Sequence, residues 1–300
     1  MKLAEFIKEG VAALEQLYPT AEARSIVFIL CEDKLGTKNY THIIEPEYEV
    51  PSAKEPALRE ALGRLCNGEP IQYVTGKAEF CGFTFKVSPN VLIPRPETEL
   101  LCREAIKVCG RMHRMREAYG DQIGPVRVLD LCTGSGCIAW TVLLSVPRVE
   151  VTAVDISEEA LKVAESQSFA AELKACGNKA PTFIQADVLD TDHIPALGKF
   201  DVILSNPPYI LESEKPKMRR NVLDYEPSLA LFVPDEDPLK FHEAIMKWSE
   251  TLISHDGVGF TEINESLAPE TQALIRSHGF TTADIIKDFF DKNRFIAYKK

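Results

Sequence analysis

The spacing of hydrophobic positions changes near residue 75. Up to that point apolar side chains recur at helical spacing, and turn signals such as Leu35-Gly36 and Glu45-Pro46 divide the segments. This stretch holds no convincing alternation of the kind that marks a strand. We therefore predict a small helical bundle over residues 1–75.

A short region with strand character follows the bundle. Residues 80–87 alternate between apolar and polar side chains, like a strand of a hairpin, and Pro94 and Pro96 stiffen the chain beyond it. We predict a β-hairpin linker over residues 76–96. A helix is then expected near Leu100, with Glu97 or Thr98 as its cap and the charged run 111–121 as its surface extension.

From Val126 onward, apolar strands alternate with helical segments. Strands are expected over residues 126–131, 150–154, 182–186, 200–204 and 258–263, with helices over 138–146, 239–252 and 269–277. Such alternation is typical of a parallel sheet. Two late strands, 281–286 and 294–298, are close enough to pair antiparallel. Residues 97–300 are therefore expected to form a Rossmann-like α/β domain, with a mostly parallel sheet and an antiparallel last strand.

The strand 126–131 runs into a glycine-containing turn, Cys132-Thr133-Gly134-Ser135-Gly136, which opens a helix. Gly134 and Gly136 permit unusual φ angles and let the backbone approach a ligand at a helix N-terminus. The next strand ends in Asp155, nineteen residues after Gly136, where a carboxylate can bind ribose hydroxyls. NAD sites and S-adenosylmethionine sites both use this arrangement, so the turn and the acid leave the cofactor open.

A fourth strand ends in Asn206-Pro207-Pro208-Tyr209. The prolines remove two backbone donors, the asparagine adds a carbonyl acceptor, and the tyrosine adds a flat ring. This loop suits a planar NH2 group. The order of glycine turn, Asp155, Asp187 at the third strand end, and Asn206–Tyr209 is that of amino-methyltransferases that use S-adenosylmethionine. A hydride-transfer enzyme has no evident use for the fourth of these motifs, Asn206–Tyr209.

Almost the whole chain resembles the protein-glutamine N5-methyltransferases that modify peptide chain release factors. The resemblance rests on the helical N-terminal region, on residues 68–76 (GEPIQYVTG), on residues 93–99 (IPRPETE), on the glycine turn and on Asn206–Tyr209. It also takes in Tyr225-Glu226-Pro227. The run IPRPETE together with Asn-Pro-Pro-Tyr is highly specific. The tetrapeptide alone also occurs in DNA adenine and ribosome-modifying methyltransferases, so amino-methylation of nucleic acid or a ribosomal protein is the alternative function.

The resemblance implies S-adenosylmethionine as cofactor and assigns residues to it: Cys132, Thr133, Gly134, Ser135, Gly136, Asp155, Asp187, Val188 and Asn206. It implies a substrate-glutamine site at Asn206, Pro207, Pro208 and Tyr209, with Asn206, Pro207 and Tyr209 as the catalytic group. The substrate would be the glutamine of the Gly-Gly-Gln loop of release factors, recognised through residues 1–75. Two departures from the family pattern are Cys132, where glycine is usual, and residues 232–238, which lack paired glycines.

A mechanism follows for a poor nucleophile such as an amide nitrogen. We expect the Asn206 side-chain oxygen and the Pro207 carbonyl to accept the two N–H bonds of the glutamine, and Tyr209 to pack on the amide plane. Glu262, at the end of a late strand, either faces the cofactor cleft or is a solvated strand end, and the second interpretation is favoured. Arg95 and Glu97 either line the cleft or only pin the linker to the sheet; the residues leave both interpretations open.

Composition narrows the classes of function and location that remain. The formal net charge is −11, which argues against a nucleic-acid substrate because such affinity depends on cationic contacts to phosphate. No apolar run approaches the roughly 20 residues of a membrane span. The first residues lack the composition of a signal or transit peptide, so a cytoplasmic location is expected. The eight cysteines lack a C-x-x-C pair and the six histidines are scattered, so we expect reduced thiols and no metal.

Overall fold

The computed structural model describes residues 1–119 and 124–300, and these form two compact units. One unit comprises Met1–Lys77 with Met218–Tyr225, and the other comprises Ala78–Lys217 with Glu226–Lys300. The sequence pattern does not reveal that residues 218–225 belong to the first unit. Arg219 Nη1 lies 2.7 Å from Glu22 Oε1, and the Tyr225 hydroxyl donates to the Asn67 carbonyl over 2.9 Å. Periodicity cannot show pairings between positions so far apart in sequence.

The first unit is helical, as predicted. Its helices are α1 (Leu3–Leu14), α2 (Thr20–Leu35), α3 (Thr41–Ile44), α4 (Glu55–Cys66), α5 (Ile71–Thr75) and α10 (Arg220–Tyr225). The amphipathic repeat buries Phe6, Leu14, Leu30 and Leu58 completely between α1, α2 and α4. Burial of these side chains supplies the main stabilising term for so small a bundle.

A hairpin opens the second unit. The alternating run 80–87 is divided between strands β1 (Lys77–Phe80) and β2 (Phe83–Lys86), so the expected single strand is interrupted by a turn. Cys81 and Gly82 form that turn with φ angles of 51° and 81°. Phe80 and Phe85 point into the core of the second unit, which anchors the hairpin there.

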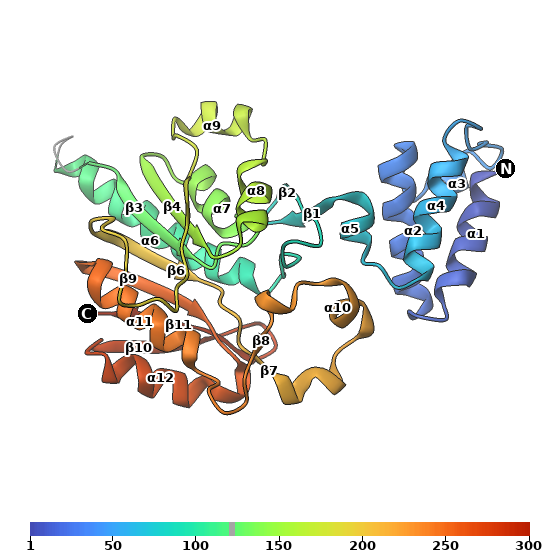
Figure 1. Ribbon diagram of the computed structural model, residues 1–300. Coiled ribbons are helices and arrows are strands. Elements are labelled where there is room, and N and C mark those ends of the chain that lie inside the picture. Colours follow the sequence, from blue (N-terminus) through green and yellow to red (C-terminus); the bar gives the residue numbers. More distant parts are fainter. Residues whose placement is uncertain (120–123) are drawn as a thin grey trace. The chain divides into compact units, whose positions relative to one another are not determined.

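The second unit is built on a seven-stranded sheet (Figure 1), in the order β10-β11-β9-β6-β3-β4-β5. Its strands are β3 (Val126–Leu131), β4 (Val149–Asp155), β5 (Thr182–Gln185), β6 (Phe200–Ser205), β9 (Ile253–Glu262), β10 (Thr282–Lys287) and β11 (Asn293–Lys299). Neighbours from β9 to β5 pair in parallel, whereas β11 is antiparallel to both β9 and β10. The predicted fold class, with its antiparallel last strand, is confirmed.

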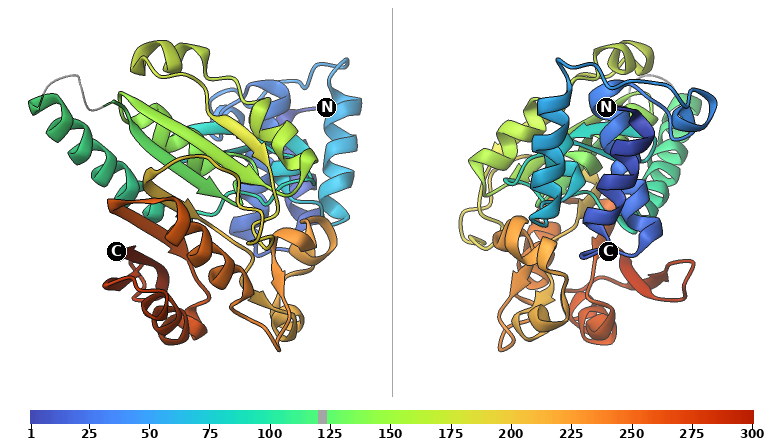
Figure 2. Two further views of the ribbon diagram at one scale, coloured as in Figure 1. Left: turned by 60° about the vertical axis from the view of Figure 1, so that its left-hand side comes forward. Right: turned by 90° about the vertical axis from the view of Figure 1, so that its right-hand side faces the viewer.

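Helices cover both faces of this sheet (Figures 1 and 2). Val126 and Val128 of β3 pack with α6 (Thr98–Ala118) and α7 (Cys137–Ser145), while Leu129 and Leu131 pack with α11 (Lys240–Leu252) and α12 (Ala268–Ser277). Both faces of the central strands are therefore buried, which explains their continuous apolar sequence. The charged run expected as a surface extension is the end of α6, which stops at Ala118; Asp121 lies outside the described residues.

Shorter elements complete the second unit. They are α8 (Glu158–Glu165), α9 (Ala170–Cys176), the two-residue strands β7 (Ile210–Leu211) and β8 (Phe232–Val233), and 3-10 turns at Glu212–Lys217, Ser228–Ala230 and Glu265–Leu267. No helix within residues 1–119 and 124–300 combines the length and apolar character that a membrane crossing requires.

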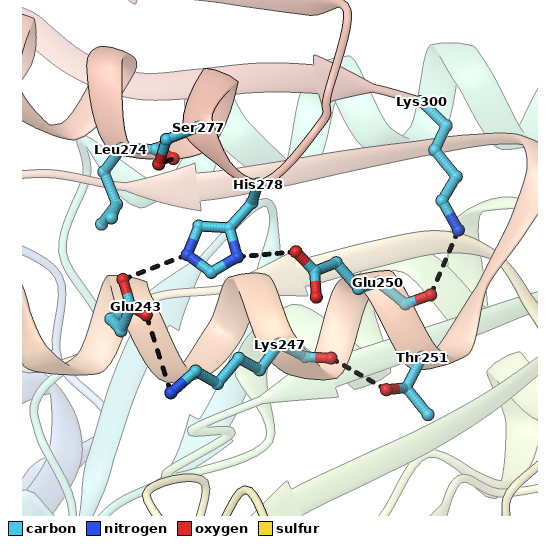
Figure 3. A network of polar contacts seen from close by, with 8 residues as sticks. All are labelled: Glu243, Lys247, Glu250, Thr251, Leu274, Ser277, His278 and Lys300. Carbon is cyan, nitrogen blue, oxygen red and sulfur yellow. Dashed lines mark hydrogen bonds and ion pairs between the residues drawn. The ribbon is translucent and has the colours of Figure 1, made fainter.

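An ion-pair network joins the two helices α11 and α12 (Figure 3). His278, just after α12, contacts Glu243 Oε2 through Nε2 at 3.0 Å and Glu250 Oε1 through Nδ1 at 2.7 Å. Lys247 forms a longer ion pair with Glu243 at 3.6 Å. Burial alone would lower the pKa of His278, but the two carboxylates outweigh it and raise that pKa.

Candidate active site

A cavity lies at the carboxyl edge of the parallel strands, within the second unit. Ligands of open α/β sheets bind at this edge because the strand-to-helix loops meet there. Its lining includes nine of the predicted site residues: Cys132, Thr133, Gly134, Ser135, Asp155, Asp187, Val188, Asn206 and Pro208. Gly136, Pro207 and Tyr209 do not line it.

The glycine turn forms one wall of the cavity. Gly134 has a φ of 55°, and a Cβ built there meets no atom within 4 Å, so open space borders its backbone. Gly136 has a φ of 78° and serves as the N-cap of α7. A Cβ on Gly136 would lie 3.0 Å from the side chains of Ala164 and Trp140, so this glycine lets α7 and α8 pack closely. Its role is structural in the geometry seen.

Cys132 adopts a backbone conformation that favours glycine. Its φ is 62°, in the left-handed region that other residues rarely occupy. The departure from the family pattern noted at this position therefore leaves the turn in its glycine-like shape and places strain on the cysteine. Burial raises the pKa of the Cys132 thiol well above its ordinary value, so the side chain stays neutral.

Asp155 closes the turn from the neighbouring strand. Its Oδ2 accepts a hydrogen bond from Gly134 N at 2.8 Å and its Oδ1 accepts one from Ser157 N at 2.9 Å. Burial raises the pKa of Asp155, and these two backbone donors oppose that rise. Each carboxylate oxygen keeps a lone pair for a further donor, such as a ribose hydroxyl.

Asp130 is a brace that sequence reasoning did not single out. Its side chain is fully buried, and its Oδ2 accepts the Thr133 hydroxyl at 2.6 Å. Burial raises the pKa of Asp130 to about 7. The carboxyl group thus sits beneath the glycine turn and fixes Thr133, rather than facing the cavity.

The Asn206–Tyr209 loop leaves β6 at the same edge. Asn206 lines the cavity and is half-buried, and Pro207 and Pro208 are buried. Asn264, beyond β9, donates from Nδ2 to the Tyr209 carbonyl at 3.1 Å and holds the end of the loop. Tyr209 is not part of the cavity lining, and its hydroxyl donates to Glu262 at 2.8 Å.

Glu262 is not a solvated strand end, and this interpretation was wrong. The residue is only 3% exposed, and its carboxylate accepts the Tyr209 hydroxyl and the Thr98 hydroxyl, the latter at 2.8 Å. The strand β9 ends between β6 and β11, so its last side chain is enclosed by neighbouring elements. Alternation alone could not distinguish this enclosed end from an open one.

Thr98 also departs from its expected role. Helix α6 begins at Thr98, yet neither Glu97 nor Thr98 caps it with a side-chain hydrogen bond. The Thr98 hydroxyl is instead committed to Glu262, and Thr98 lines the cavity. The sequence signal that could have found it is its place inside the IPRPETE run.

Arg95 both lines the cavity and pins a loop. Its Nη2 lies 2.6 Å from Glu226 Oε1, and Glu226 Oε2 accepts from Ile93 N at 3.2 Å. The two interpretations from the sequence, a cleft between the domains and a pin of the linker to the sheet, stay predictions for Arg95. Glu97 makes only a long contact of 3.9 Å with Arg294.

Asp187 and Val188, two of the predicted cofactor residues, follow shortly after the end of β5. Asp187 Oδ1 accepts from Leu189 N at 2.8 Å, and the Val188 carbonyl accepts the Trp248 indole N–H at 3.0 Å. Further lining residues that the sequence did not indicate are Asn90, Leu92, Ile138, Ile156, Ser157, Ala160, Leu229 and Phe241. Most of these additions are apolar, as expected for a wall that holds a flat ring.

The other groups considered from the sequence show no assembly. All eight cysteines carry free thiols. Among the residues that the structure describes, no group of three or more His, Cys, Asp or Glu side chains is arranged to hold a metal ion.

Comparison with known proteins decides the family. Residues 121–223 match the methyltransferase small domain, and residues 5–76 match the PrmC N-terminal domain. A release factor glutamine methyltransferase of Bacteroides thetaiotaomicron is 37% identical over 98% of this chain and 98% of its own length. The corresponding protein of Flavobacterium psychrophilum is 32% identical over 99% of this chain and 98% of its own length.

The chain belongs to the release factor glutamine methyltransferase family. The relatives, which are named as methyltransferases of release factor glutamine, do not favour the nucleic-acid alternative. The catalytic domain of hMettl16, solved with the MAT2A 3'UTR hairpin 6, superposes with a TM-score of 0.51 and 12% identity. That superposition covers 83% of this chain and 82% of the other, and it shows a shared fold only.

Proposed function

We propose that this release factor glutamine methyltransferase family member transfers a methyl group from S-adenosylmethionine to the side-chain amide nitrogen of a glutamine. The substrate is the glutamine of the Gly-Gly-Gln loop of peptide chain release factors. The observation that carries the proposal is Asn206 on the cavity wall, one strand away from the glycine turn and two strands away from Asp155. This places an amide-reading side chain beside a pocket suited to the cofactor.

The residues of the cavity fit S-adenosylmethionine. Asp155 offers free lone pairs for ribose hydroxyls, open space borders the Gly134 backbone, and Ile156 and Val188 provide an apolar wall for an adenine ring. Bound S-adenosylmethionine supplies a methyl carbon on a positively charged sulfur, which the acidic surroundings of the turn favour.

Asn206 and Pro207 orient the reacting amide. The Asn206 Oδ1 and the Pro207 carbonyl accept the two N–H bonds of the glutamine, which fixes its nitrogen and raises its electron density. The rate gain then comes from positioning and from preorganised dipoles, not from a basic side chain. The amide proton is released to solvent. The Tyr209 hydroxyl, bonded to Glu262, supports this loop, and its ring packs on the amide plane of the glutamine.

Recognition of the folded substrate falls to the helical unit, with residues 1–75 as its sequence-defined part and residues 76–96 as the linker to a catalytic domain over 97–300. Residues 1–75 carry eight Lys or Arg and twelve Asp or Glu residues, and this negative balance favours a basic partner surface. Because release factors act on ribosomes, the proposed activity places the enzyme in the cytoplasm.

Substitution of Asn206 tests the proposal. Asn206→Ala removes one acceptor, and turnover on an intact release factor should fall by roughly 10²–10³-fold, the usual loss for one preorganised polar group. Asn206→Asp keeps an oxygen and should retain more activity than Ala but less than the parent. Cofactor affinity, measured by calorimetry, serves as the control. Near-parental turnover by Asn206→Ala would refute the mechanism.

A further inference from the structure

Two buried polar side chains, Thr98 and Glu262, are linked by hydrogen bonds in series to the half-buried Asn206. Asn206 Nδ2 donates to Thr98 Oγ1 at 3.2 Å, and the Thr98 hydroxyl donates to Glu262 Oε2 at 2.8 Å. Thr98 is 2% exposed and Glu262 is 3% exposed. The three residues come from separate elements, the start of α6, the exit of β6 and the end of β9, so no local sequence feature requires them to meet.

The direction of these bonds determines which way the Asn206 amide faces. A hydroxyl carries one proton, and Thr98 uses this proton to donate to the Glu262 carboxylate. An ionised carboxylate can only accept hydrogen bonds. The Thr98 oxygen is then left as an acceptor, which the NH2 group of Asn206 can satisfy and its carbonyl oxygen cannot. The Asn206 oxygen is therefore directed to the other side, where the cavity lies. The two ends of an asparagine amide are otherwise nearly interchangeable in shape.

Glu262 is itself held from several sides. Its backbone pairs with Phe295 of β11, its carbonyl accepts from His242 Nε2 at 2.9 Å, and its second carboxylate oxygen accepts the Tyr209 hydroxyl. Burial lowers the pKa of His242, so this ring is neutral and donates from Nε2. The end of the chain is thus fixed before any substrate arrives.

We propose that Thr98 and Glu262 are positioning residues that hold the Asn206 side-chain oxygen toward the substrate amide. The proposal rests on the proposed function, because it assigns a role for that same reaction. Without the Thr98 hydroxyl, the Asn206 amide loses the partner that distinguishes its two ends. It then spends part of its time with NH2 facing the substrate, where two donors oppose each other.

The test compares Thr98→Val, which keeps shape and deletes the hydroxyl, with Thr98→Ser, which keeps the hydroxyl. We expect Thr98→Val to lower kcat by about 10–100-fold, less than loss of the acceptor itself. Thr98→Ser should restore most of that loss, and the Kd for S-adenosylmethionine should stay within about twofold of the parent in both. Thr271→Val is the matched control: Thr271 is equally buried, its hydroxyl donates to the Leu267 carbonyl, and it lies in α12.

Other outcomes separate the explanations. A Thr98→Val enzyme with parental kcat, or one that weakens cofactor binding as much as it lowers kcat, would overturn the positioning role. A parent enzyme that methylates no glutamine would instead refute the proposed function. In that case the NMR signals of the Asn206 side-chain NH2 still test the hydrogen bond to Thr98. One proton should show a hydrogen-bonded shift that Thr98→Val removes. Absence of that shift in the parent would contradict the positioning role.

A second, independent observation concerns the turn between β10 and β11. Phe289 and Phe290 are 87% and 84% exposed, yet the turn that carries them is well held. Asp288 accepts from Phe290 N at 2.8 Å and from Lys292 N at 3.0 Å with one oxygen, and from Arg294 Nε at 2.7 Å with the other. Two adjacent aromatic rings on an ordered turn are unusual for a surface without a partner.

The turn lies at the edge of the sheet where the cavity opens. Ser205 pairs with Thr261, and Glu262 pairs with Phe295, so Asn206, Glu262 and Phe295 stand at one level on adjacent strands. Phe290 precedes Phe295 by five residues. At about 3.3 Å per residue the turn reaches at most roughly 17 Å beyond that level. Figure 2 shows this hairpin, in red, reaching out from the sheet.

We infer that Phe289 and Phe290 form a docking surface for the protein substrate. A folded protein that delivers a glutamine to Asn206 must cover the rim of the cavity, and exposed aromatic pairs supply large contact area at interfaces. This inference also rests on the proposed function, since a small-molecule substrate would not reach the turn. The rings add affinity for the intact protein and touch nothing at the reacting amide.

The double variant Phe289→Ser with Phe290→Ser tests the docking surface. We expect the KM for an intact release factor to rise by about 10-fold or more, while kcat/KM for a short Gly-Gly-Gln peptide stays unchanged. Tyr119→Ser is the control, because Tyr119 is 76% exposed but lies at the far end of the 21-residue helix α6, about 30 Å from Thr98. An unchanged KM for the intact protein would overturn the inference. If the parent methylates neither substrate, the proposed function fails, and unaltered binding of the intact protein to the double variant would still refute docking.

Discussion

At the scale of single residues, the strand-end positions are predictable from the sequence and their enclosure is not. Asp155, Asp187 and Asn206 follow apolar strands, and parallel strands bring their carboxyl ends to one edge. Glu262 obeys the same rule, but its burial depends on β11 and α6, which are distant in sequence. Local pattern therefore finds where a side chain emerges, and tertiary packing decides whether it meets water.

Asp155 should contribute to cofactor affinity through its free lone pairs. Asp155→Ala should weaken binding of S-adenosylmethionine by roughly 1.5–3 kcal/mol, the range for a hydrogen bond to a charged group. Part of that loss comes from the freed Gly134 N–H, so an analogue without ribose hydroxyls separates the two effects. Calorimetry should show that the analogue loses less affinity than the natural cofactor on this substitution. Equal losses would remove Asp155 from the ribose site, and Asp190→Ala is a control on an exposed acid.

Cys132 should report the strain in the glycine turn. Cys132→Gly and Cys132→Ala both delete the thiol, but only glycine accepts a φ of 62° without strain. The glycine variant should therefore be more stable than the alanine variant by about 1 kcal/mol, the lower end of the cost of a left-handed backbone. Urea unfolding measures the difference. Equal stability of the two variants would mean that the turn relaxes around the side chain.

At the scale of elements, periodicity locates the strands of the seven-stranded sheet and helices α6, α7, α11 and α12, but not the shorter elements α8, α9, β7 and β8. Helix α12 spans Ala268–Ser277, within one residue of expectation, whereas β9 begins at Ile253, five residues before its expected start. The hairpin β1–β2 escapes the pattern because Cys81 continues the apolar alternation while its φ of 51° turns the chain. The cap of α6 escapes it because the Thr98 hydroxyl has a distant partner, which local capping rules cannot include.

The ion-pair network between α11 and α12 should make the stability of the folded protein depend on pH. Because the folded-state pKa of His278 is raised, its contribution is complete below the unfolded pKa of about 6.5 and is lost as pH rises through the folded value. The facing groups are Glu243, Glu250 and Lys247. His278→Gln should lower the melting temperature at pH 6 and change it less at pH 9. His255→Gln, at a fully exposed site, is the control. If His278→Gln lowered the melting temperature equally at both pH values, the stabilising role of the ion-pair network would be contradicted.

At the scale of the whole molecule, the order of the glycine turn, Asp155, Asp187 and Asn206–Tyr209 along the chain is sufficient to indicate the activity. The site itself depends on the fold, because Arg95 meets Glu226, and Thr98 meets Asn206, across more than a hundred residues. The inclusion of Met218–Tyr225 in the helical unit also lies beyond sequence reasoning, since it depends on contacts such as Tyr225 with Asn67. Composition indicates only the sign of charge that each part presents.

The helical unit should use its acidic surface for substrate recognition. Reversing two exposed acids, Glu15→Lys with Glu45→Lys, should raise the KM for an intact release factor by about 3–10-fold, since rim charges act mainly on the rate of encounter. The effect should shrink at high salt. Methylation of a short peptide should not change. Glu150→Lys with Glu172→Lys in the second unit is the control, and a KM that responds equally to both pairs would contradict a specific role.

One measurement tests the central claim directly. A purified release factor is incubated with the enzyme and S-adenosylmethionine, and the modified residue is located by mass spectrometry of its peptides. The account predicts a single added methyl group on the side-chain amide of the Gly-Gly-Gln glutamine, present with the parent enzyme and nearly absent with Asn206→Ala. A methyl group on another residue, or none on the release factor while nucleic acid in the same mixture becomes methylated, would contradict it.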